Sequence, residues 1–408
     1  MEHLKSPMSQ NQWWQRPRLI TADESGQERK VSWLELFYDL IFVIVISELS
    51  HYLSAHVSFA GALGYILLFV AAWWAWIGGT FYNARFETKD ISYRLITYIQ
   101  ILPVAAMAIF AHDAVGNTAA PFALAYAVVR IVIICLWLRG GWHEPRFRPV
   151  SNRYAIGFSI SVLLFVTSVF VPAPLRFALW GCGLLCDLVT PIMTLAQQAR
   201  LPRLSNSKLP ERFGLFVIIV LGEAIVGIIR GVAQQESLTF VVAVRGALCM
   251  ALVFGLWWVY FDFVARHVEF RQPRPGLWAM LAWGYLHLPL VMGIAAVGAG
   301  AINLLEDEIL DADGRWLITA AIATALFAIG LIELTLRRDA DEPTDLQVSF
   351  TLKIAGGLLA LALGAWGAGL GPTGLLIALF LPLLIQMVYG AYVWFRSPAA
   401  HSPLAVDS

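Results

Sequence analysis

Twelve apolar segments, each about twenty residues long, constrain this chain more than any other feature of its sequence. They are separated by charged or Pro- and Gly-containing breaks. They lie near 34–53, 61–82, 92–111, 120–138, 154–172, 175–196, 212–231, 239–262, 278–301, 315–336, 350–368 and 373–395. A helix needs about 20 apolar residues to cross the hydrocarbon core of a bilayer. The pattern therefore predicts an all-α, polytopic transmembrane bundle of about twelve spans.

Composition supports this class. The chain has 408 residues, of which 59% are hydrophobic and 14% are charged. Soluble domains average about 45–50% apolar and about 25% charged residues. The formal net charge is zero, so no overall attraction to nucleic acid is expected. The four cysteines fall inside apolar segments and indicate no disulfide framework.

The distribution of positive charge predicts the orientation of the spans. With both termini cytoplasmic, 23 of the 28 Lys and Arg residues fall in cytoplasmic segments, four fall outside, and Arg130 lies within a span. Cytoplasmic loops of membrane proteins carry such an excess of Lys and Arg. We therefore expect both termini to be cytoplasmic.

Three landmarks recur in the same order in the two halves, which indicates an internal duplication. They are Glu48 and Glu223, Trp73-Trp74 and Trp257-Trp258, and Leu102-Pro103 and Leu288-Pro289. Six spans per half is an even number, so both halves would have the same membrane orientation. The predicted divisions are a cytoplasmic polar tail (1–30), a first six-helix unit (31–200), a cytoplasmic linker (201–211), a second six-helix unit (212–396) and a disordered cytoplasmic tail (397–408).

Two motifs resemble a known family. Residues 33–43 read WLELFYDLIFV and residues 211–223 read ERFGLFVIIVLGE. They are similar to the first and second motifs of the bacterial low-temperature-requirement A family, and spacing and hydropathy are compatible over about residues 28–396. The resemblance implies a multi-pass protein of the bacterial cytoplasmic (inner) membrane, named after a growth-in-cold phenotype. It implies no established reaction, substrate or catalytic residues.

Carboxylates within the apolar segments are the main candidates for a site. A charge at the centre of a bilayer-spanning helix costs roughly 2.5–3.5 kcal/mol on insertion scales, and such residues often mark an ion or substrate path. Glu48 and Glu223 are in this position. We interpret them as groups that bind protons or a cation. The alternative is a protonated or hydrogen-bonded Glu that only locks two helices together.

Three further polar residues fall at mid-span. Arg130 requires a carboxylate partner or a water-filled cavity, and Glu48, Glu223 and Asp187 are the candidates. Asp187 precedes Pro191, and His287 precedes Pro289. An interrupted helix beside a polar residue often indicates a binding site in transporters. Arg130, Asp187 and His287 are therefore placed on the path, with a structural ion pair and a hydrogen-bonded kink as the alternatives.

Other candidates lie near the span ends or among aromatic residues. Glu35 and Asp39 share one helix face near the cytoplasmic end and would form an inner gate. Glu35 could instead favour only the positive end of the helix dipole. Two aromatic clusters either line a binding cavity or pack in the interior. They contain Trp73, Trp74, Trp257 and Trp258.

The leading hypothesis is a secondary transporter that moves a small solute with coupled protons or cations. One alternative is a membrane-embedded lipid-handling protein or enzyme, and another is a structural or sensory membrane protein. The sequence has no G-x-S-x-G, H-E-x-x-H or Walker A motif, so no catalytic residue, metal or cofactor is assigned. The expected partners are membrane lipids, a solute and its coupling ion. The small-residue stripe Gly356, Ala360, Gly364 and Ala368 suits close helix contact within the chain or in a homo-oligomer.

Overall fold

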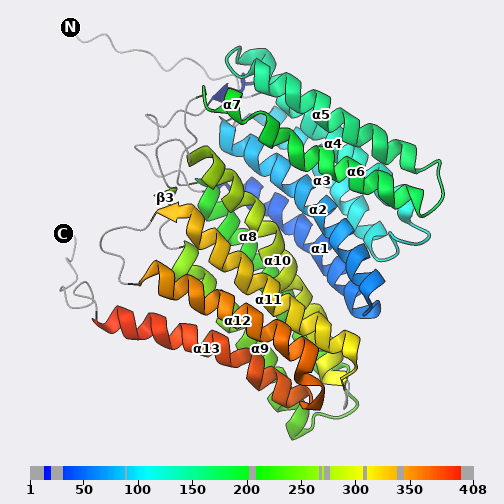
Figure 1. Ribbon diagram of the computed structural model, residues 1–408. Coiled ribbons are helices and arrows are strands. Elements are labelled where there is room, and N and C mark those ends of the chain that lie inside the picture. Colours follow the sequence, from blue (N-terminus) through cyan, green and yellow to red (C-terminus); the bar gives the residue numbers. More distant parts are fainter. Residues whose placement is uncertain are drawn as a thin grey trace. The chain divides into compact units, whose positions relative to one another are not determined.

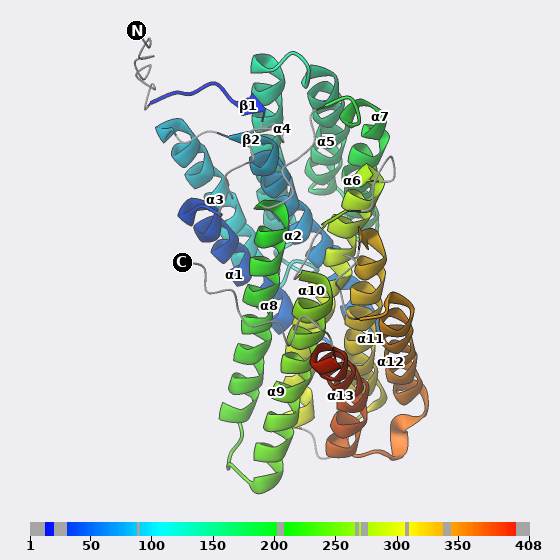
Figure 2. The ribbon, with the colours of Figure 1, turned by 90° about the vertical axis from the view of Figure 1, so that its left-hand side faces the viewer.

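The computed structural model describes residues 13–19, 31–87, 90–201, 208–265, 269–270, 276–306, 310–337 and 344–396. The regular secondary structure of these residues is helical except for four two-residue strands (Figures 1 and 2). Most of the predicted tail at 1–30, most of the linker at 201–211 and the tail at 397–408 lie outside the described residues.

The prediction of twelve long helices is confirmed, because each of the twelve apolar segments forms one helix. Eleven of these helices, in the described part of the chain, are long and apolar enough to cross a membrane. The first helix, α1, spans Trp33–Ala55 and is not among the eleven. It contains three carboxylates, Glu35, Asp39 and Glu48. The protein is thus a polytopic membrane protein with at least eleven candidate spans.

Contacts between Cα atoms divide the chain into two compact units. Unit 1 contains residues 1–45 and 70–209, and unit 2 contains residues 46–69 and 210–408. The division falls inside α1 and inside α2 (Phe59–Arg85). Glu48 and Glu223 therefore both belong to unit 2, whereas Arg130 and Asp187 belong to unit 1.

Unit 1 is built around successive antiparallel helices. The remaining elements in it are β1 (Arg18–Leu19), β2 (Phe86–Glu87), α3 (Ile91–Ala111), α4 (Ala119–His143), α5 (Arg148–Ser168), α6 (Leu175–Met193) and α7 (Leu195–Gln198). Helix α4 packs against α3 and α5, and α5 packs against α6. The strands β1 and β2 pair antiparallel, with Arg18 opposite Glu87, and so attach the segment before α1 to the end of α2.

Unit 2 contains the remaining long helices. They are α8 (Lys208–Ala233), α9 (Phe240–Tyr260), α10 (Gly276–Glu306), α11 (Ala312–Thr335), α12 (Leu346–Trp366) and α13 (Pro372–Arg396). A turn of π-helix (Phe261–Ala265) extends α9, and a 3₁₀ turn (Gly367–Gly369) follows α12. Strands β3 (Glu269–Phe270) and β4 (Leu336–Arg337) pair antiparallel. Helix α11 packs between α10 and α12, and α13 packs against α9 and α12.

Side-chain caps fix where several helices begin. A helix leaves its first N–H groups without intrahelical acceptors, and an Asp, Ser or Thr side chain satisfies one of them. Asp90, Thr239, Asp311 and Asp345 fill this role for α3, α9, α11 and α12. Each cap is the residue directly before its helix, so the sequence dictates these helix starts locally.

Small residues allow close helix packing in unit 2. A Cβ on Gly298 of α10 would lie 2.7 Å from the Cα of Ala224 in α8. A Cβ on Gly356 would meet Pro382, and one on Gly364 would meet Thr319. The predicted glycine stripe of α12 therefore contacts helices of the same chain at these two positions.

Pro191 and Pro289, the prolines that follow Asp187 and His287, affect their helices differently. Helix α10 continues without a break through Pro289, from Gly276 to Glu306. Helix α6 ends two residues after Pro191. The expectation of an interrupted helix beside His287 is therefore wrong, because a membrane helix can absorb one missing hydrogen bond where neighbouring helices support it.

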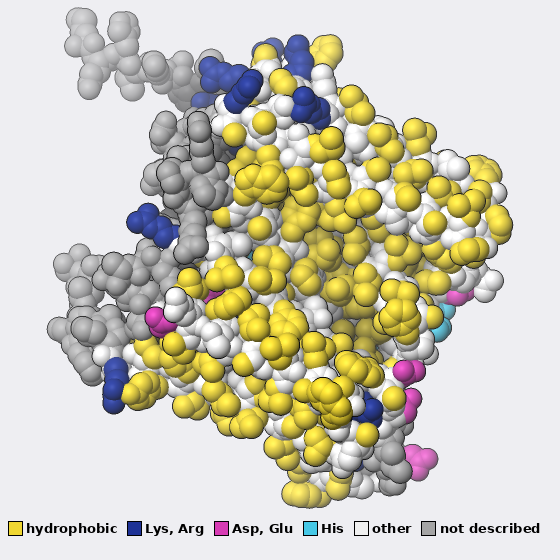
Figure 3. All heavy atoms as spheres, viewed as in Figure 1, with side chains coloured by type: hydrophobic (Ala, Val, Ile, Leu, Met, Phe, Trp, Pro, Cys, Tyr) yellow, Lys and Arg dark blue, Asp and Glu magenta, His cyan; other side chains and the backbone are white. Residues whose placement is uncertain are grey.

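Hydrophobic side chains dominate the described surface seen in Figure 3. Ile109, Leu163 and Ile229 are each more than half exposed. Exposed aliphatic surface of this extent requires an apolar solvent around the helices. The surface therefore agrees with the membrane assignment made from helix length and composition.

Candidate functional site

Glu48 and Glu223 are partly exposed carboxylates within long helices of unit 2. Glu48 lies in α1 and Glu223 lies in α8, and a run of bulky aliphatic residues precedes each of them in its helix. Neither forms a hydrogen bond or an ion pair within the part of the chain that the structure describes. A Cβ on the adjacent Gly222 would meet no atom within 4 Å. These carboxylates are therefore not locked into protein contacts.

A polar contact joins α1 and α8 near their C-terminal ends. The Nη1 atom of Arg230 lies 2.7 Å from Nε2 of His51. An arginine nitrogen can only donate, so His51 accepts through Nε2 as a neutral ring with its proton on Nδ1. This contact shows which sides of the two helices face one another.

The helical repeat places both carboxylates along this interface. Glu48 is three residues before His51, so the two side chains are neighbours on the same side of α1. Glu223 is seven residues before Arg230, which is about two turns and returns to the same side of α8. We name Glu48, His51, Glu223 and Arg230 the α1–α8 polar seam.

Arg130 has the partner that sequence reasoning required, and the partner is Asp187. Arg130 Nη2 donates to Asp187 Oδ1 at 2.6 Å, and both side chains are completely buried. Tyr126 and Ser161 donate their hydroxyl groups to Asp187 Oδ2 at 2.6 and 2.7 Å. The guanidinium also lies 4.1 Å from the centre of the Phe158 ring. The cluster ties α4, α5 and α6 together in unit 1.

Two nitrogens of Arg130 remain without acceptors. Nε and Nη1 have no hydrogen-bond partner within the described residues, although they are buried. A Cβ on Gly78 would come within 3.2 Å of Nη1, so α2 approaches the guanidinium closely there. The Asp187 carboxylate is fully engaged by three donors, whereas the arginine keeps unused donor capacity.

His287 is completely buried in unit 2 and both its nitrogens are engaged. Its Nδ1 lies 2.7 Å from the Trp283 carbonyl oxygen, which can only accept, so Nδ1 carries a proton. Its Nε2 lies 2.9 Å from the Tyr260 hydroxyl. The Phe213 ring contacts the imidazole edge-on at 4.9 Å. His287 is therefore held among aromatic side chains of α8, α9 and α10.

Glu35 and Asp39 lie in the first turns of α1 in unit 1, and both are buried. Glu35 Oε2 accepts from the Ser32 amide at 2.9 Å, while the Glu35 amide donates to Ser32 Oγ at 3.3 Å. This reciprocal arrangement is a capping box that begins α1. Asp39 accepts from the indole nitrogen of Trp76 at 2.8 Å. Glu35 thus caps the start of α1, at the positive end of the helix dipole where the sequence offered an alternative to gating.

The four candidate tryptophans occupy different environments. Trp73 and Trp74 are buried in α2, and the Trp73 ring lies 4.7 Å from the ring of Trp76. Trp257 is 39% exposed and stacks on Phe254. Packing within the protein thus accounts for Trp73 and Trp74.

Sequence reasoning missed a second buried ion pair. Lys353 Nζ lies 3.1 Å from Glu333 Oε2, and Ser349 joins both residues through its hydroxyl. Lys353 also lies over the Phe263 ring at 4.2 Å. Lys353 is one of the 23 basic residues that the charge distribution places on the cytoplasmic side, but its side chain lies buried in α12. The isolated Glu333 in an otherwise apolar segment was the signal that could have revealed the pair.

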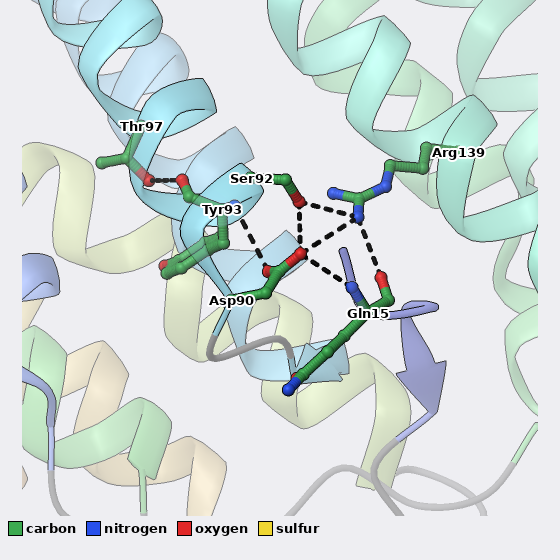
Figure 4. Close-up of polar contacts among 6 residues, drawn as sticks. All are labelled: Gln15, Asp90, Ser92, Tyr93, Thr97 and Arg139. Atoms are coloured by element: carbon green, nitrogen blue, oxygen red, sulfur yellow. Dashed lines mark hydrogen bonds and ion pairs between the residues drawn. The ribbon is translucent and has the colours of Figure 1, made fainter. Parts of the chain in front are cut away.

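A second missed cluster surrounds Asp90 at the start of α3 (Figure 4). Asp90 accepts from the Gln15 amide at 2.8 Å, from the Ser92 hydroxyl and from the Tyr93 amide. Arg139 of α4 donates to the Gln15 carbonyl oxygen at 3.0 Å and lies 3.9 Å from Asp90. The sequence predicts that residues 13–18 are part of the polar tail at 1–30. The described residues 13–19 instead contact unit 1.

The hydrogen bonds at this cluster shift the titration of Asp90. Burial raises the pKa of a carboxyl group, but the Ser92 hydroxyl and the Gln15 and Tyr93 amides outweigh burial here. The pKa of Asp90 consequently lies below its ordinary value. The carboxylate is therefore ionised at neutral pH and stabilises the attachment of residues 13–19.

Comparison with known proteins identifies the family. Residues 30–390 match the model of the bacterial low temperature requirement A protein (LtrA). An uncharacterized protein of Rhizobium meliloti (strain 1021) is 28% identical over 295 residues, which cover 68% of this chain and 70% of that protein. Together with the helical membrane architecture, the match over most of the chain shows that this protein belongs to the LtrA family.

Proposed function

We propose that this protein is a secondary transporter that couples the movement of a small solute to protons or cations through the α1–α8 polar seam. The observation that carries the proposal is that Glu48 and Glu223 have no protein partner within the described residues. Both lie on helices of membrane length. Ionisable groups in such positions usually face a polar interior and mark an ion or substrate path.

The seam has the chemistry needed to exchange a proton or hold a cation. Two carboxylates on facing helix sides can bind a monovalent cation with their oxygen atoms, or each can take up a proton. The His51–Arg230 contact closes the C-terminal end of the same interface. His51 is exposed, so this end of the seam reaches the surface of unit 2.

The other candidate residues have structural, solute-binding or gating roles in this proposal. Arg130 and Asp187 hold α4, α5 and α6 in register, and the unused donors of Arg130 offer a place for an anionic solute group. His287 lines the path from its aromatic surroundings in unit 2. Glu35 and Asp39 act at an inner gate, supported by their place in the first turns of α1.

Orientation and duplication belong to the same proposal. We place both termini in the cytoplasm and the protein in the bacterial inner membrane, on the evidence of the asymmetric basic residues. The duplication is supported by the position of Glu48 in the first helix of its half and of Glu223 in the first helix of the other. The two halves would then supply one carboxylate each to the seam.

Proton flux into liposomes tests the proposal. The purified protein would be reconstituted with a trapped pH-sensitive dye and challenged with amino acids, sugars, organic acids and organic amines. We expect at least one solute class to drive proton flux, and Glu48→Gln and Glu223→Gln each to abolish it. Glu236→Gln is a matched control, because Glu236 is an exposed carboxylate just after α8.

The remaining outcomes separate the alternatives. If solute-driven proton flux persists in both Glu48→Gln and Glu223→Gln, the seam does not couple solute movement to protons. Lipid scrambling or turnover without any solute flux favours a lipid-handling protein. If no flux occurs and both substitutions only lower the unfolding temperature, the two glutamates serve helix packing.

A further inference from the structure

An apolar cavity of about 510 Å³ opens in unit 2 between the α1–α2 turn, α10 and α11. Its walls are formed mainly by aliphatic and aromatic side chains. The lining residues from α2, α10 and α11 include Ala62, Ile66, Met292, Ala320 and Thr324. The Tyr65 hydroxyl is already bonded to the Met292 carbonyl oxygen at 2.8 Å. The interior of the cavity can therefore pack against an apolar ligand, and it offers few polar groups for hydrogen bonding.

The cavity is elongated along the helices. Its lining on α11 runs from Asp313 to Thr324, eleven residues or about 16 Å of helix. On the other side it runs from Ser58 to Ile66, about 12 Å. Half of a hydrocarbon core is about 15 Å thick. A cavity of this length parallel to membrane-spanning helices fits one extended acyl chain better than a compact solute.

The open end of the cavity is acidic and aromatic. Asp313 is the single charged residue of the lining within the described part of the chain, it is exposed, and it lies in the first turn of α11. Phe59 and Trp316 lie at the same end and are 79% and 42% exposed. A carboxylate beside aromatic faces attracts an ammonium group by charge and by cation–π contact. Among the described residues, no Lys or Arg lines the cavity that would attract the charge of an acidic headgroup.

We propose that this cavity binds one acyl chain of a membrane lipid whose headgroup carries an amine. The chain lies along α2 and α11, and the ammonium group contacts Asp313 and Trp316 at the open end. The site is separate from the α1–α8 polar seam and does not depend on a transport function.

Lipid binding to the purified full-length protein tests the site. The delipidated protein would be titrated with phosphatidylethanolamine and phosphatidylglycerol of identical acyl chains, and native mass spectrometry would count bound lipids. We expect one tightly retained lipid, with phosphatidylethanolamine preferred about threefold to fivefold, the size that an exposed ion pair contributes. Asp313→Asn should abolish the preference, and Glu236→Gln should preserve it.

Filling the cavity should displace the lipid. We expect Ala320→Phe and Ala62→Phe each to remove the retained lipid, because both residues line the cavity and a larger side chain there would occupy its volume. Leu331→Phe is the control on α11, since Leu331 is 41% exposed and does not line the cavity. A variant counts as folded if its unfolding temperature is close to that of the unchanged protein. Two positions are substituted so that the test still holds if one of the variants fails to fold.

Three results would overturn the proposal. Equal retention of both lipids by the unchanged protein removes the amine preference. Undiminished lipid in a folded Ala320→Phe or Ala62→Phe variant removes the cavity as the site. A dimer that both filling substitutions dissociate would show that a second copy of the chain, and not a lipid, covers the groove.

Discussion

At the residue scale, the most consequential feature is that Arg130 and Asp187 are buried together. Breaking such a pair by removing one partner leaves an uncompensated charge and typically costs about 3–5 kcal/mol. The Tyr126 and Ser161 hydroxyls aim at Asp187 and would also lose their acceptor. The pair is therefore a point where a single substitution should be severe and a double substitution milder.

We predict that Asp187→Leu lowers the free energy of unfolding by about 3–5 kcal/mol. Arg130→Met alone should also destabilise, because Asp187 would keep only hydroxyl donors. The double variant should be more stable than Asp187→Leu, since no buried charge remains. Reversible unfolding in detergent micelles measures all three proteins. A double variant as unstable as the sum of the single variants would show that the two residues act independently.

Sequence alone predicted that Arg130 needs a carboxylate partner, but it did not predict the ion pair of unit 2. Arg130 interrupts an apolar run, so it needed a carboxylate at similar depth, and Asp187 was one of three candidates. The charge distribution places Lys353 with the cytoplasmic basic residues, whereas its side chain contacts Glu333 and the Phe263 ring. Depth along a helix can be read from sequence, whereas the direction of a long side chain depends on its neighbours.

At the element scale, α8 and α10 approach so closely that Gly298 has little room for a side chain. A Cβ there would lie 2.7 Å from Ala224 Cα and 3.2 Å from its Cβ. Backbone atoms cannot move aside as a flexible side chain can, so the helices would have to separate.

We predict that Gly298→Ala lowers the free energy of unfolding by about 1–3 kcal/mol, as overpacking of a close contact usually does. Gly222→Ala in α8 is the matched control, because a Cβ there meets open space. It should change stability by less than about 1 kcal/mol. Equal changes in stability in the two variants would mean that the close contact at Gly298 does not decide the effect, because helix propensity alone favours Ala over Gly in both.

At the element scale, residues 13–19 are also attached to α3 and α4 by polar contacts. Arg139 bonds the Gln15 carbonyl oxygen, and its guanidinium lies 4.2 Å from the centre of the Trp14 ring. Hydrogen bonds to charged groups contribute about 1.5–3 kcal/mol each. We predict that Arg139→Ala speeds hydrogen exchange at the Gln15 amide by at least about tenfold. Arg146→Ala, at an exposed arginine in the next turn, should leave the exchange unchanged.

Acid should release the same segment. Because the pKa of Asp90 is lowered in the folded protein, its ionisation adds stability that is complete above the ordinary value of about 3.9 and is lost as the pH falls through the lowered pKa. Exchange at the Gln15 amide, corrected for its intrinsic pH dependence, should therefore rise only under strongly acidic conditions. Asp90→Asn should show fast exchange at neutral pH and no further acid-dependent change.

At the scale of the whole molecule, sequence predicted the helices well and the site only in part. Hydropathy and length locate helices because each span must satisfy its own backbone hydrogen bonds in lipid. The partition into compact units could not be derived in that way, since it depends on which halves of α1 and α2 pack with which helices. The α1–α8 seam likewise required the His51–Arg230 contact to show which helix sides face each other.

The role of α1 decides the topology of the whole chain. Eleven other helices qualify as spans, so the termini lie on the same side only if α1 also crosses the membrane. Its three carboxylates disfavour insertion. However, Glu35 is held in the capping box at the first turn, Asp39 is buried against Trp76, and Glu48 faces the seam. None of the three carboxylates therefore has to face lipid, and α1 can cross as the twelfth span.

Labelling from each side of the membrane tests this count. In a variant without the four native cysteines, we expect cysteines at Glu144 and Arg200 to react with an impermeant maleimide only in inside-out vesicles. Cysteines at Asn117 and Ser237 should react only in right-side-out vesicles, because an odd number of spans separates them from the first pair in the chain. A tag before residue 1 should then be accessible in inside-out vesicles. If the four loops label as expected but the tag is reached from outside, α1 does not cross, and Glu48 loses the membrane-embedded position on which proton coupling depends.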